Sequence, residues 1–310
     1  MTAQPQVDIV VATNRASPYL EAAVRSVAEQ TYPHWSLIVV DDGVADPAFV
    51  PHAVRHITGA RVIRHINRGL GASRNAGMAA GSSPLIAFLD DDDVWAPSKL
   101  DAQVDSLAAA ADALGSFTGG WYMDHHGVSQ GWGWTAATRS STDFLRGAEP
   151  LPRIVTLMIR RTALDEIDGF LPSLTMAEDL EFTLRLLQAG PLACAPGQLT
   201  GYRRHANNMT AIDLVALRRA AEHALALVLV AAEQRGDATV LALLRENLRR
   251  SRAQWSKECA RSVGAALRHL DLRTLALELR WAATTAPGST TAAALQKAGA
   301  KLLAPRPADR

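Results

Sequence analysis

The sequence predicts an α/β protein with a mostly parallel sheet, helices on both faces of that sheet and an all-helical C-terminal extension. Four segments in the first hundred residues are short, apolar and β-branched, which is typical of strands: 7–12, 36–41, 61–65 and 84–90. Helical patterns separate them, and strands that are apolar on both faces indicate a sheet covered on both sides. After about residue 211 the chain is rich in Ala, Leu and Arg in a helical pattern.

Apolar spacing marks the helices. Ser17 is placed to cap the first helix, Pro18 suits its first turn, and three apolar residues share one face: Leu20, Val24 and Val27. Another helix is predicted to begin at Pro97, with the apolar repeat Leu100, Val104, Leu107 and Ala111. From 115 to 210 the pattern is mixed, with strands at 115–123 and 154–160 and a helix at about 178–189. We therefore divide the chain into a catalytic α/β domain, 1–210, and a helical extension, 211–310, which a Thr-rich segment interrupts near 284–293.

Composition narrows the class of protein. The formal net charge of +1 predicts no nucleic-acid partner, and two cysteines are too few for a disulfide framework. The first residues lack a secretory pattern, and the longest apolar run, 224–232, is far shorter than the roughly 20 residues that span a bilayer. We expect a cytoplasmic protein.

Four aspartates follow the fourth predicted strand, in "IAFLDDDDVW". If the strand stays extended, Asp90 and Asp92 point to one side and Asp91 to the other. Carboxylate oxygens suit Mg²⁺ or Mn²⁺, which complete their shell with substrate phosphates, so a diphosphate-bearing ligand is the natural partner. The alternative is a set of acids at the amino-terminus of the next helix. Asp93 is either a support for the pair or the cap of that helix.

Four segments together identify a family. "VDIVVATNRASPYLEAAVRSVAEQTYPHWSLIVVDDG", "NRGLGASRNAGMAAG", "FLDDDDVWAPSKL" and "EDLEFTLRLLQAG" resemble, in order and spacing, the inverting family 2 glycosyltransferases. The resemblance covers residues 7 to about 210. It implies a GT-A (Rossmann-like) fold, a nucleoside-diphosphate sugar donor of the UDP, dTDP or GDP type, and a hydroxyl acceptor, in the synthesis of cell-surface glycans or glycoconjugates.

The resemblance also implies roles for the acidic and polar residues after the strands. Its DXD motif maps to Asp90, Asp91 and Asp92, with Asp92 on Mn²⁺ or Mg²⁺, Asp90 on the ribose or the metal shell, and Asp91 in donor binding. Residues after the first two strands would hold the nucleotide: Thr13, Asn14, Asp41 and Asp42. The chain departs from the family in "VATNRAS" and "DDGVAD", where a stacking aromatic and a serine are usual, and "DDG" alone also suits a turn.

Three further segments carry candidate residues. In "NRGLGASRNAG", Arg74 and Asn75 occupy the family's R-N positions, where an Arg meets phosphate or uracil oxygens. In "MAEDLEF", the family assigns the catalytic base to the acidic pair, and we choose Asp179 over Glu178. In "GYRRHANN", His205 is a candidate metal ligand and Arg204 a candidate phosphate contact.

Two regions leave alternatives open. The segment 119–134 holds three Trp and two His, which suit either a sugar-ring site or the packing of a hairpin. The helix around 245–268 has seven basic and two acidic residues interleaved with apolar ones, which suits an anionic membrane surface, packing on the catalytic domain or a homodimer contact. Competing functions are a nucleotidyltransferase and a catalytically silent sugar-nucleotide-binding scaffold.

Overall fold

The computed structural model describes residues 4–208, 213–269 and 271–285. The strands within these residues are β1 (Val7–Thr13), β2 (Trp35–Asp42), β3 (Arg61–His65), β4 (Leu85–Asp90), β5 (Val94–Trp95), β6 (Gly115–Met123), β7 (Ser129–Trp134), β8 (Leu157–Arg160) and β9 (Leu192–Arg203). The helices are α1 (Leu20–Ala28), α2 (Phe49–Val54), α3 (Leu70–Ala80), α4 (Lys99–Ala109), α5 (Ser141–Leu145), α6 (Leu164–Ile167), α7 (Glu178–Ala189), α9 (Leu214–Gln234), α10 (Ala238–His269) and α11 (Leu272–Thr285).

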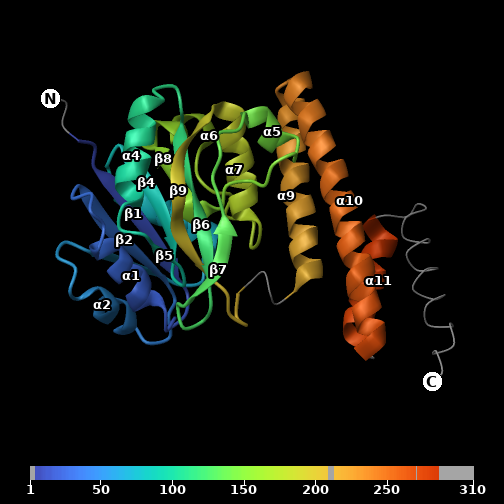
Figure 1. Cartoon of the computed structure of the whole chain (residues 1–310), viewed down its shortest axis with the longest axis horizontal. Coiled ribbons are helices and arrows are strands. Elements are labelled where there is room, and N and C mark those ends of the chain that lie inside the picture. Colours follow the sequence, from blue (N-terminus) through green and yellow to red (C-terminus); the bar gives the residue numbers. More distant parts are fainter. Residues whose placement is uncertain (1–3, 209–212, 270, 286–310) are drawn as a thin grey trace.

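The described strands form a single sheet in the order β3-β2-β1-β4-β8-β6-β9-β5, with β7 paired to β6 (Figure 1). Strands β3, β2, β1 and β4 are parallel. Strand β8 is antiparallel to both β4 and β6, and β9 is parallel to β6. Strands β4, β6 and β9 therefore run in one direction, and their carboxyl ends meet those of β1 and β2 at one edge of the sheet.

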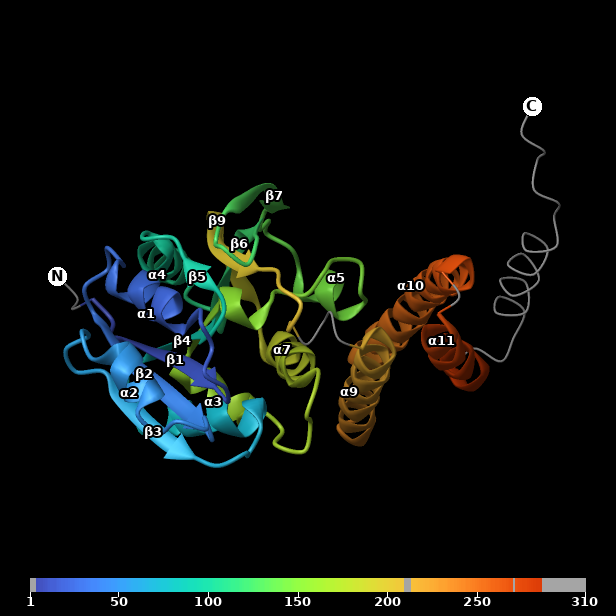
Figure 2. The same ribbon diagram turned by 90° about the horizontal axis from the view of Figure 1, so that it is seen from below.

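Side-chain alternation places a hydrophobic core on each face of the sheet. In β4, Leu85, Ala87 and Leu89 pack with α1, α2 and α4. Ile86 and Phe88 point the other way and pack with α7 and α9. Figure 2 shows α1 and α4 on one side of the sheet and α3 on the other. Burial on both faces explains why these strands are almost continuously apolar.

Most predicted elements agree with the structure, but two helix starts and one strand differ. Ile154–Thr156 of the predicted strand 154–160 form a 3-10 helix, and only Leu157–Arg160 form β8; β9 was not predicted. The predicted strand 61–65, strand 115–123 and helix 178–189 match β3, β6 and α7. Ser17 does not occupy the N-cap position of α1, which begins at Leu20 after Tyr19; its hydroxyl accepts the backbone N–H of Tyr19 at 3.3 Å and donates to the backbone oxygen of Asp91. Helix α4 begins at Lys99 rather than Pro97, and Ser98 occupies its N-cap position, so Asp93 is not that cap.

The helices after residue 213 share a core with the α/β sheet. Leu225 and Val228 of α9 and Leu244 of α10 pack in the same cluster as Leu184 of α7 and Phe144 of α5, and Figure 1 shows α9 beside α7. The apolar residues of the basic helix face inward too: Leu244, Leu248, Trp255, Val263 and Leu267 all belong to core clusters. Their burial favours the packing alternative for α10.

No helix in the described part of the chain is both long and apolar enough to cross a membrane. The predicted α/β sheet with a helical extension is confirmed. The predicted division at residue 210 stays a prediction, and most of the predicted break at 284–293 lies outside the described residues.

Candidate active site

Predicted site residues from four segments gather at the carboxyl edge of the sheet. The register places Thr13 opposite Asp41 and Ala12 opposite Asp90, so the ends of β1, β2 and β4 lie side by side. Ligands of parallel α/β sheets bind at such an edge, outside the carboxyl ends of the strands. The acidic helix start at Glu178 reaches the same place, because Arg74 of α3 bridges Glu178 to Asp90.

The predicted alternation through the four aspartates is wrong beyond the first two. Strand β4 ends at Asp90 and the chain turns at 91–92, so Asp92 does not share a partner with Asp90. Asp91 accepts a hydrogen bond of 2.5 Å from the Thr13 hydroxyl. Asp92 Oδ2 lies 3.4 Å from Arg15 Nη2, and the same nitrogen lies 4.0 Å from Asp91 Oδ1. Arg15 therefore joins Asp91 and Asp92, while Asp90 faces α3.

Burial and mutual repulsion make this cluster costly to ionise. Burial, followed by the charge of Asp92, raises the pKa of Asp91 to about 7. Burial, followed by Asp90, raises the pKa of Asp92, and the hydrogen bond from His205 opposes that rise. Burial also raises the pKa of Asp93 well above its usual range, with Asp92 adding to the effect. A bound cation would relieve this repulsion.

Asp93 stabilises the turn at 91–93 through Arg203. Its Oδ1 accepts the backbone N–H of Arg203 at 2.8 Å, and its Oδ2 is buried without a hydrogen-bond partner among the described residues. Arg203 in turn donates from Nε to the backbone oxygen of Asp92 at 2.7 Å. Of the two roles predicted for Asp93, the contacts favour support of the turn at 91–93.

Arg74 links the aspartate cluster to α7. Its side chain is 4% exposed, with Nη2 2.8 Å from Asp90 Oδ1 and Nη1 2.8 Å from Glu178 Oε1. Both carboxylates together raise the pKa of the guanidinium, against the opposing effect of burial. Arg74 was predicted to meet phosphate or uracil oxygens, but in this structure its fork is occupied by two carboxylates.

The two acidic residues at the start of α7, Glu178 and Asp179, have different surroundings. Burial raises the pKa of Glu178, Arg74 opposes that rise, and Asp179 adds to it. Asp179 is half-buried, and no described cation forms an ion pair with it. Ala177, the residue before the pair, has a left-handed backbone with φ +60° and packs against Ala224 of α9. Packing against α9 therefore stabilises the left-handed turn that precedes Glu178 and Asp179.

Asp41 and Asp42 are engaged by the loops around them. Asp41 Oδ1 accepts the backbone N–H groups of Gly43 and Val44, and Arg64 binds its other oxygen. Asp42 accepts the backbone N–H groups of Arg68 and Gly69, at 2.7 and 2.8 Å, and contacts His65 Nδ1 at 2.9 Å. Neither carboxylate keeps an oxygen without a partner, so both fix the shape of the 43–44 and 68–69 segments.

The predicted nucleotide-binding residues Asn14, Asn75 and Arg204 form no hydrogen bond or ion pair with the aspartate cluster. Asn14 is exposed beside Thr13. The Asn75 amide is used by the backbone of Phe170, donating to its oxygen at 2.8 Å and accepting from its nitrogen at 2.7 Å. Arg204 is exposed and lies over the rings of Tyr122 and Trp132, not over the aspartates.

His205 lies on Asp92. Its Nε2 is 3.0 Å from Asp92 Oδ2, and its Nδ1 accepts the backbone N–H of Asn207 at 3.2 Å. Because Nδ1 accepts, the proton of the neutral ring is on Nε2 and is donated to Asp92. In this arrangement His205 orients Asp92. To bind a metal through Nε2, the ring would have to move its proton to Nδ1 and lose the contact with Asn207.

Sequence reasoning missed three residues of this site: Arg15, Tyr19 and Arg203. Tyr19 stacks on the His205 ring at 5.0 Å, and the Arg203 guanidinium lies 4.5 Å from the Tyr19 ring centroid. Arg15 and Tyr19 follow β1 and Arg203 ends β9, so their position after strands was a usable signal.

The oxygen ligands at this site fit a hard cation whose coordination shell is completed by substrate phosphates. Among the described residues no group of three or more His, Cys, Asp and Glu side chains is arranged to hold a metal ion. Mg²⁺ and Mn²⁺ are commonly held by one or two carboxylates together with substrate phosphates, so a complete protein cage is not expected. The repelling carboxylates and the unpartnered Oδ2 of Asp93 are consistent with such a cation.

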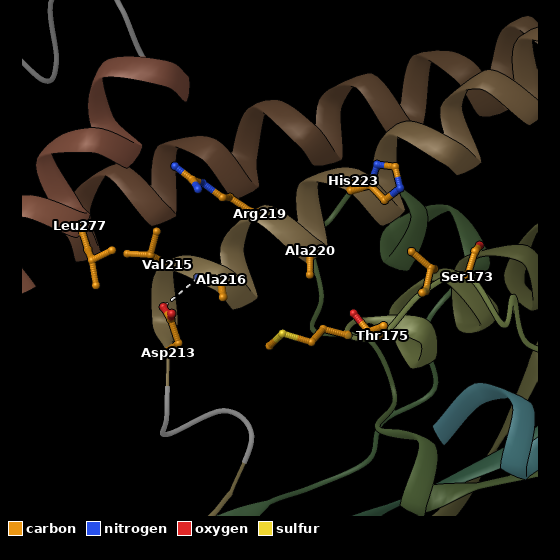
Figure 3. Close-up of a pocket in the computed structure, with 11 residues that line it drawn as sticks. Ser173, Thr175, Asp213, Val215, Ala216, Arg219, Ala220, His223 and Leu277 are labelled. Carbon is orange, nitrogen blue, oxygen red and sulfur yellow. Dashed lines mark hydrogen bonds between the residues drawn. The ribbon is translucent and has the colours of Figure 1, made fainter. Parts of the chain in front are cut away.

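A separate hollow of about 360 Å³ lies between α9 and the loop 173–176 (Figure 3). Its lining includes Thr175 from the loop, Arg219 and His223 from α9, and Leu277 from α11. None of the predicted site residues lines it, so we do not place the donor there.

Comparison with known proteins gives a family match for the chain. A sequence model described as "Glycosyl transferase family 2" matches residues 8–207. The Bacillus subtilis protein named "Putative teichuronic acid biosynthesis glycosyltransferase TuaG" is 29% identical over 66% of this chain and 81% of its own length. The Escherichia coli protein WfgD, named a UDP-Glc:alpha-D-GlcNAc-diphosphoundecaprenol beta-1,3-glucosyltransferase, is 32% identical over 33% of this chain and 40% of its own length.

Solved structures support the fold. The crystal structure of S. aureus TarS 1–349 in complex with UDP-GlcNAc has a TM-score of 0.65 and 16% identity, and covers 94% of this chain and 92% of that chain. A crystal structure of the same protein with UDP has a TM-score of 0.55 and 17% identity, over 71% of this chain and 65% of that chain. The predicted GT-A fold is confirmed by this likeness.

Proposed function

The chain belongs to glycosyl transferase family 2, and from this membership we propose that it transfers a sugar, with inversion, from a nucleoside-diphosphate sugar to a hydroxyl acceptor. The names of TuaG and WfgD, and the UDP and UDP-GlcNAc bound to TarS, support UDP as the donor nucleotide and a cell-surface glycan or glycoconjugate as the product.

One observation carries the proposal. Arg74 joins Asp90, at the end of β4, to Glu178, at the start of α7, by two contacts of 2.8 Å. Carboxylates that can hold the cation of a donor diphosphate are thereby brought next to carboxylates that can remove a proton. Inverting transfer needs both: a held leaving group and a base that deprotonates the attacking hydroxyl on the opposite face of the sugar.

Asp179 is the proposed base. Glu178 is held by the Arg74 guanidinium, and its freedom to accept a proton from a substrate is reduced by that ion pair. Asp179 has no ion pair with a described cation and is half-buried at the helix start. We assign proton removal from the acceptor hydroxyl to Asp179 and the positioning of α7 to Glu178.

Asp92 is the proposed cation ligand, with Asp90 and Asp93 nearby and His205 as either a second ligand or the group that orients Asp92. Mn²⁺ or Mg²⁺, when bound, would neutralise charge on the departing nucleoside diphosphate. Arg15, which now contacts Asp92 at 3.4 Å, is long and exposed enough to move to a donor phosphate.

For the nucleotide we propose two kinds of residue. Thr13, Asn14, Asp90 and Asp91 stand at the edge where a nucleotide would lie. Asp41, Asp42, Arg74 and Asn75 act through the segments that they hold, because their polar atoms are engaged by protein groups.

The test is donor binding and slow donor hydrolysis by the full chain. UDP-glucose, UDP-GlcNAc and dTDP- and GDP-sugars are each added with Mn²⁺ or with EDTA, and thermal stability and free nucleoside diphosphate are measured. We expect a UDP-sugar to stabilise the protein only with the cation, and Asp92→Ala to lose that effect. Asp112→Ala, at an exposed aspartate outside the site, is the matched control. If no nucleotide sugar stabilises the protein, or if the Asp92 variant behaves as the wild type, the proposal is wrong.

The helical extension is proposed first as a support of α7, with a homodimer or a peripheral membrane contact through it as further proposals. Basic residues of α10 remain exposed, including Arg249, Lys257 and Arg261. Co-sedimentation of the full chain with phosphatidylglycerol vesicles tests the membrane contact. For a membrane contact through these residues, the variant with all three replaced by Gln should lose vesicle binding.

A further inference from the structure

The hairpin of β6 and β7 places a group of aromatic rings at the same edge of the sheet as the aspartates. We call this group the aromatic platform and define it as Tyr122, Trp132, Trp134 and Tyr202. Tyr122 of β6 pairs in register with Tyr202 of β9, and both strands end at the carboxyl edge of the sheet. Figure 2 shows β6, β7 and β9 grouped together.

The rings of the platform contact one another in tilted and edge-on arrangements, and they contact an arginine. The Tyr122 centroid is 4.0 Å from that of Trp132, 5.2 Å from Trp134 and 5.9 Å from Tyr202. The Arg153 guanidinium lies 4.3 Å from the Tyr202 centroid and 4.6 Å from that of Trp134, and it donates to the Tyr122 hydroxyl at 2.8 Å. Arg153 therefore fixes the inner part of the platform.

Packing of the hairpin does not account for Trp132. Its side chain is 50% exposed at the outer side of Tyr122, on a strand that pairs only with β6 among the described residues. A half-exposed Trp leaves a flat apolar face for a ligand, and pyranose rings carry the complementary apolar C–H face.

A cation borders this face. The exposed Arg204 guanidinium lies 5.7 Å from the Trp132 centroid and 5.9 Å from that of Tyr122, and no carboxylate of a described residue forms an ion pair with it. Arg binds phosphate and carboxylate groups through paired N–H donors. The combination suits a sugar ring that carries an anionic group at its edge.

The platform lies next to the proposed reaction centre. Arg204 is followed by His205, whose Nε2 contacts Asp92, and is preceded by Arg203, which holds the turn at Asp92 and Asp93. A saccharide on the platform would thus lie beside the segment 203–205, which contacts the aspartate cluster.

Resting on the proposed function, we propose that Trp132, Tyr122 and Arg204 form the acceptor subsite, and that the acceptor is a saccharide carrying a phosphate or a carboxylate beside the stacked ring. This moves Arg204 from the donor, where the sequence placed it, to the acceptor.

Saturation-transfer NMR on the full chain tests the subsite with three probes: methyl β-glucoside, methyl β-glucuronide and glucose 1-phosphate. The wild type is expected to bind an anionic probe about tenfold more tightly than the neutral one, the size of one hydrogen-bonded charge pair. Trp132→Ala should lose binding of all three, and Arg204→Gln should lose only the preference for the anionic probes. Which anionic probe binds more tightly distinguishes a phosphate-bearing from a uronic-acid-bearing acceptor.

Two matched variants control for nonspecific effects: Val128→Ala, exposed on the same hairpin, and Arg249→Gln, an exposed arginine of α10. Circular dichroism checks the fold of each variant. The proposal is overturned if the wild type binds none of the probes, if Trp132→Ala binds them as the wild type does, or if UDP displaces them, which would place them in the donor site.

Wild-type binding of UDP with Mn²⁺ separates the two proposals. If UDP binds and Trp132→Ala leaves saccharide binding intact, only the acceptor subsite is wrong. If no nucleotide or nucleotide sugar binds at all, the proposed function is wrong whatever the saccharides do.

Discussion

Replacing Arg74 by methionine should destabilise the protein in a pH-dependent way. The substitution keeps much of the side-chain volume but removes a guanidinium that is 4% exposed and bridges two carboxylates at 2.8 Å. Glu178, which is buried, would lose its partner, whereas Asp90, with 31% of its side chain exposed, can be solvated. Breaking a buried ion pair from one side costs about 3 kcal/mol or more, and we expect a loss near the lower end of that range because Asp90 is partly in water.

The pH dependence follows from Glu178. Its pKa in the folded protein is already raised above the usual 4.5 by burial, and Arg74 opposes that rise. Without Arg74 the pKa rises further, so the folded variant binds a proton that the unfolded chain releases. Stability of the variant is therefore retained at low pH, where Glu178 is neutral, and is lost as the pH rises through the raised pKa.

Urea unfolding followed by circular dichroism at pH 5 and pH 8 measures both effects. The free-energy difference between Arg74→Met and the wild type should be larger at pH 8, and Arg74→Lys should lie between the two proteins. Arg55→Met removes a surface ion pair with Glu21, at 3.5 Å between half-exposed side chains, and should cost less than about 1 kcal/mol. Equal stability of Arg74→Met and wild type at both pH values, or a loss that is the same at pH 5 and pH 8, would refute this account of the bridge.

Four other substitutions test the site and its support. Because the pKa of Asp91 is raised to about 7 from 3.8, the melting temperature in EDTA should fall as the pH rises from 5 to 8, and Asp91→Asn should flatten that fall; a wild-type melting temperature independent of pH would contradict the reasoning. Asp92→Asn should abolish the Mn²⁺-dependent part of UDP binding in calorimetry, and an unchanged titration would remove Asp92 from the cation site. Asp179→Asn should lower kcat about a thousandfold while UDP affinity is kept, and a variant that retains a tenth of wild-type turnover would pass the role of base to Glu178. Phe182→Ala should cost about 4 kcal/mol in urea unfolding, since Phe182 is fully buried and stacks on Phe170 at 4.1 Å; a loss below 1 kcal/mol would mean that this core of α7 repacks.

Local sequence patterns predicted the helices and strands because the span of each element follows from the apolar spacing of its own residues. Strand β4 is apolar on both faces and α7 has its leucines at helical spacing, so their spans could be read from periodicity. The two helix starts were missed for a different reason. Ser17 has the chemistry of a cap and accepts the Tyr19 N–H, but the helix begins three positions later, and the same hydroxyl donates to the backbone oxygen of Asp91, 74 positions away in the sequence.

The residue types at the candidate site were likewise visible, while their partners were not. Asp42 and Asn75 were predicted to face the nucleotide, yet their polar atoms are used by the 68–69 loop and by Phe170. Such pairings join residues tens of positions apart, and no local pattern encodes which of several polar groups will meet.

The sequence by itself determined that acids follow β4, that an acidic pair begins α7 and that aromatic residues fill the β6–β7 hairpin, because these are properties of short segments. Only the tertiary structure decided that Arg74 is occupied by Asp90 and Glu178, that the chain turns after Asp90, and that Arg204 lies over Trp132. The physical reason is that buried charges need partners, and which charged groups and rings meet depends on the order and direction of the strands in the whole sheet.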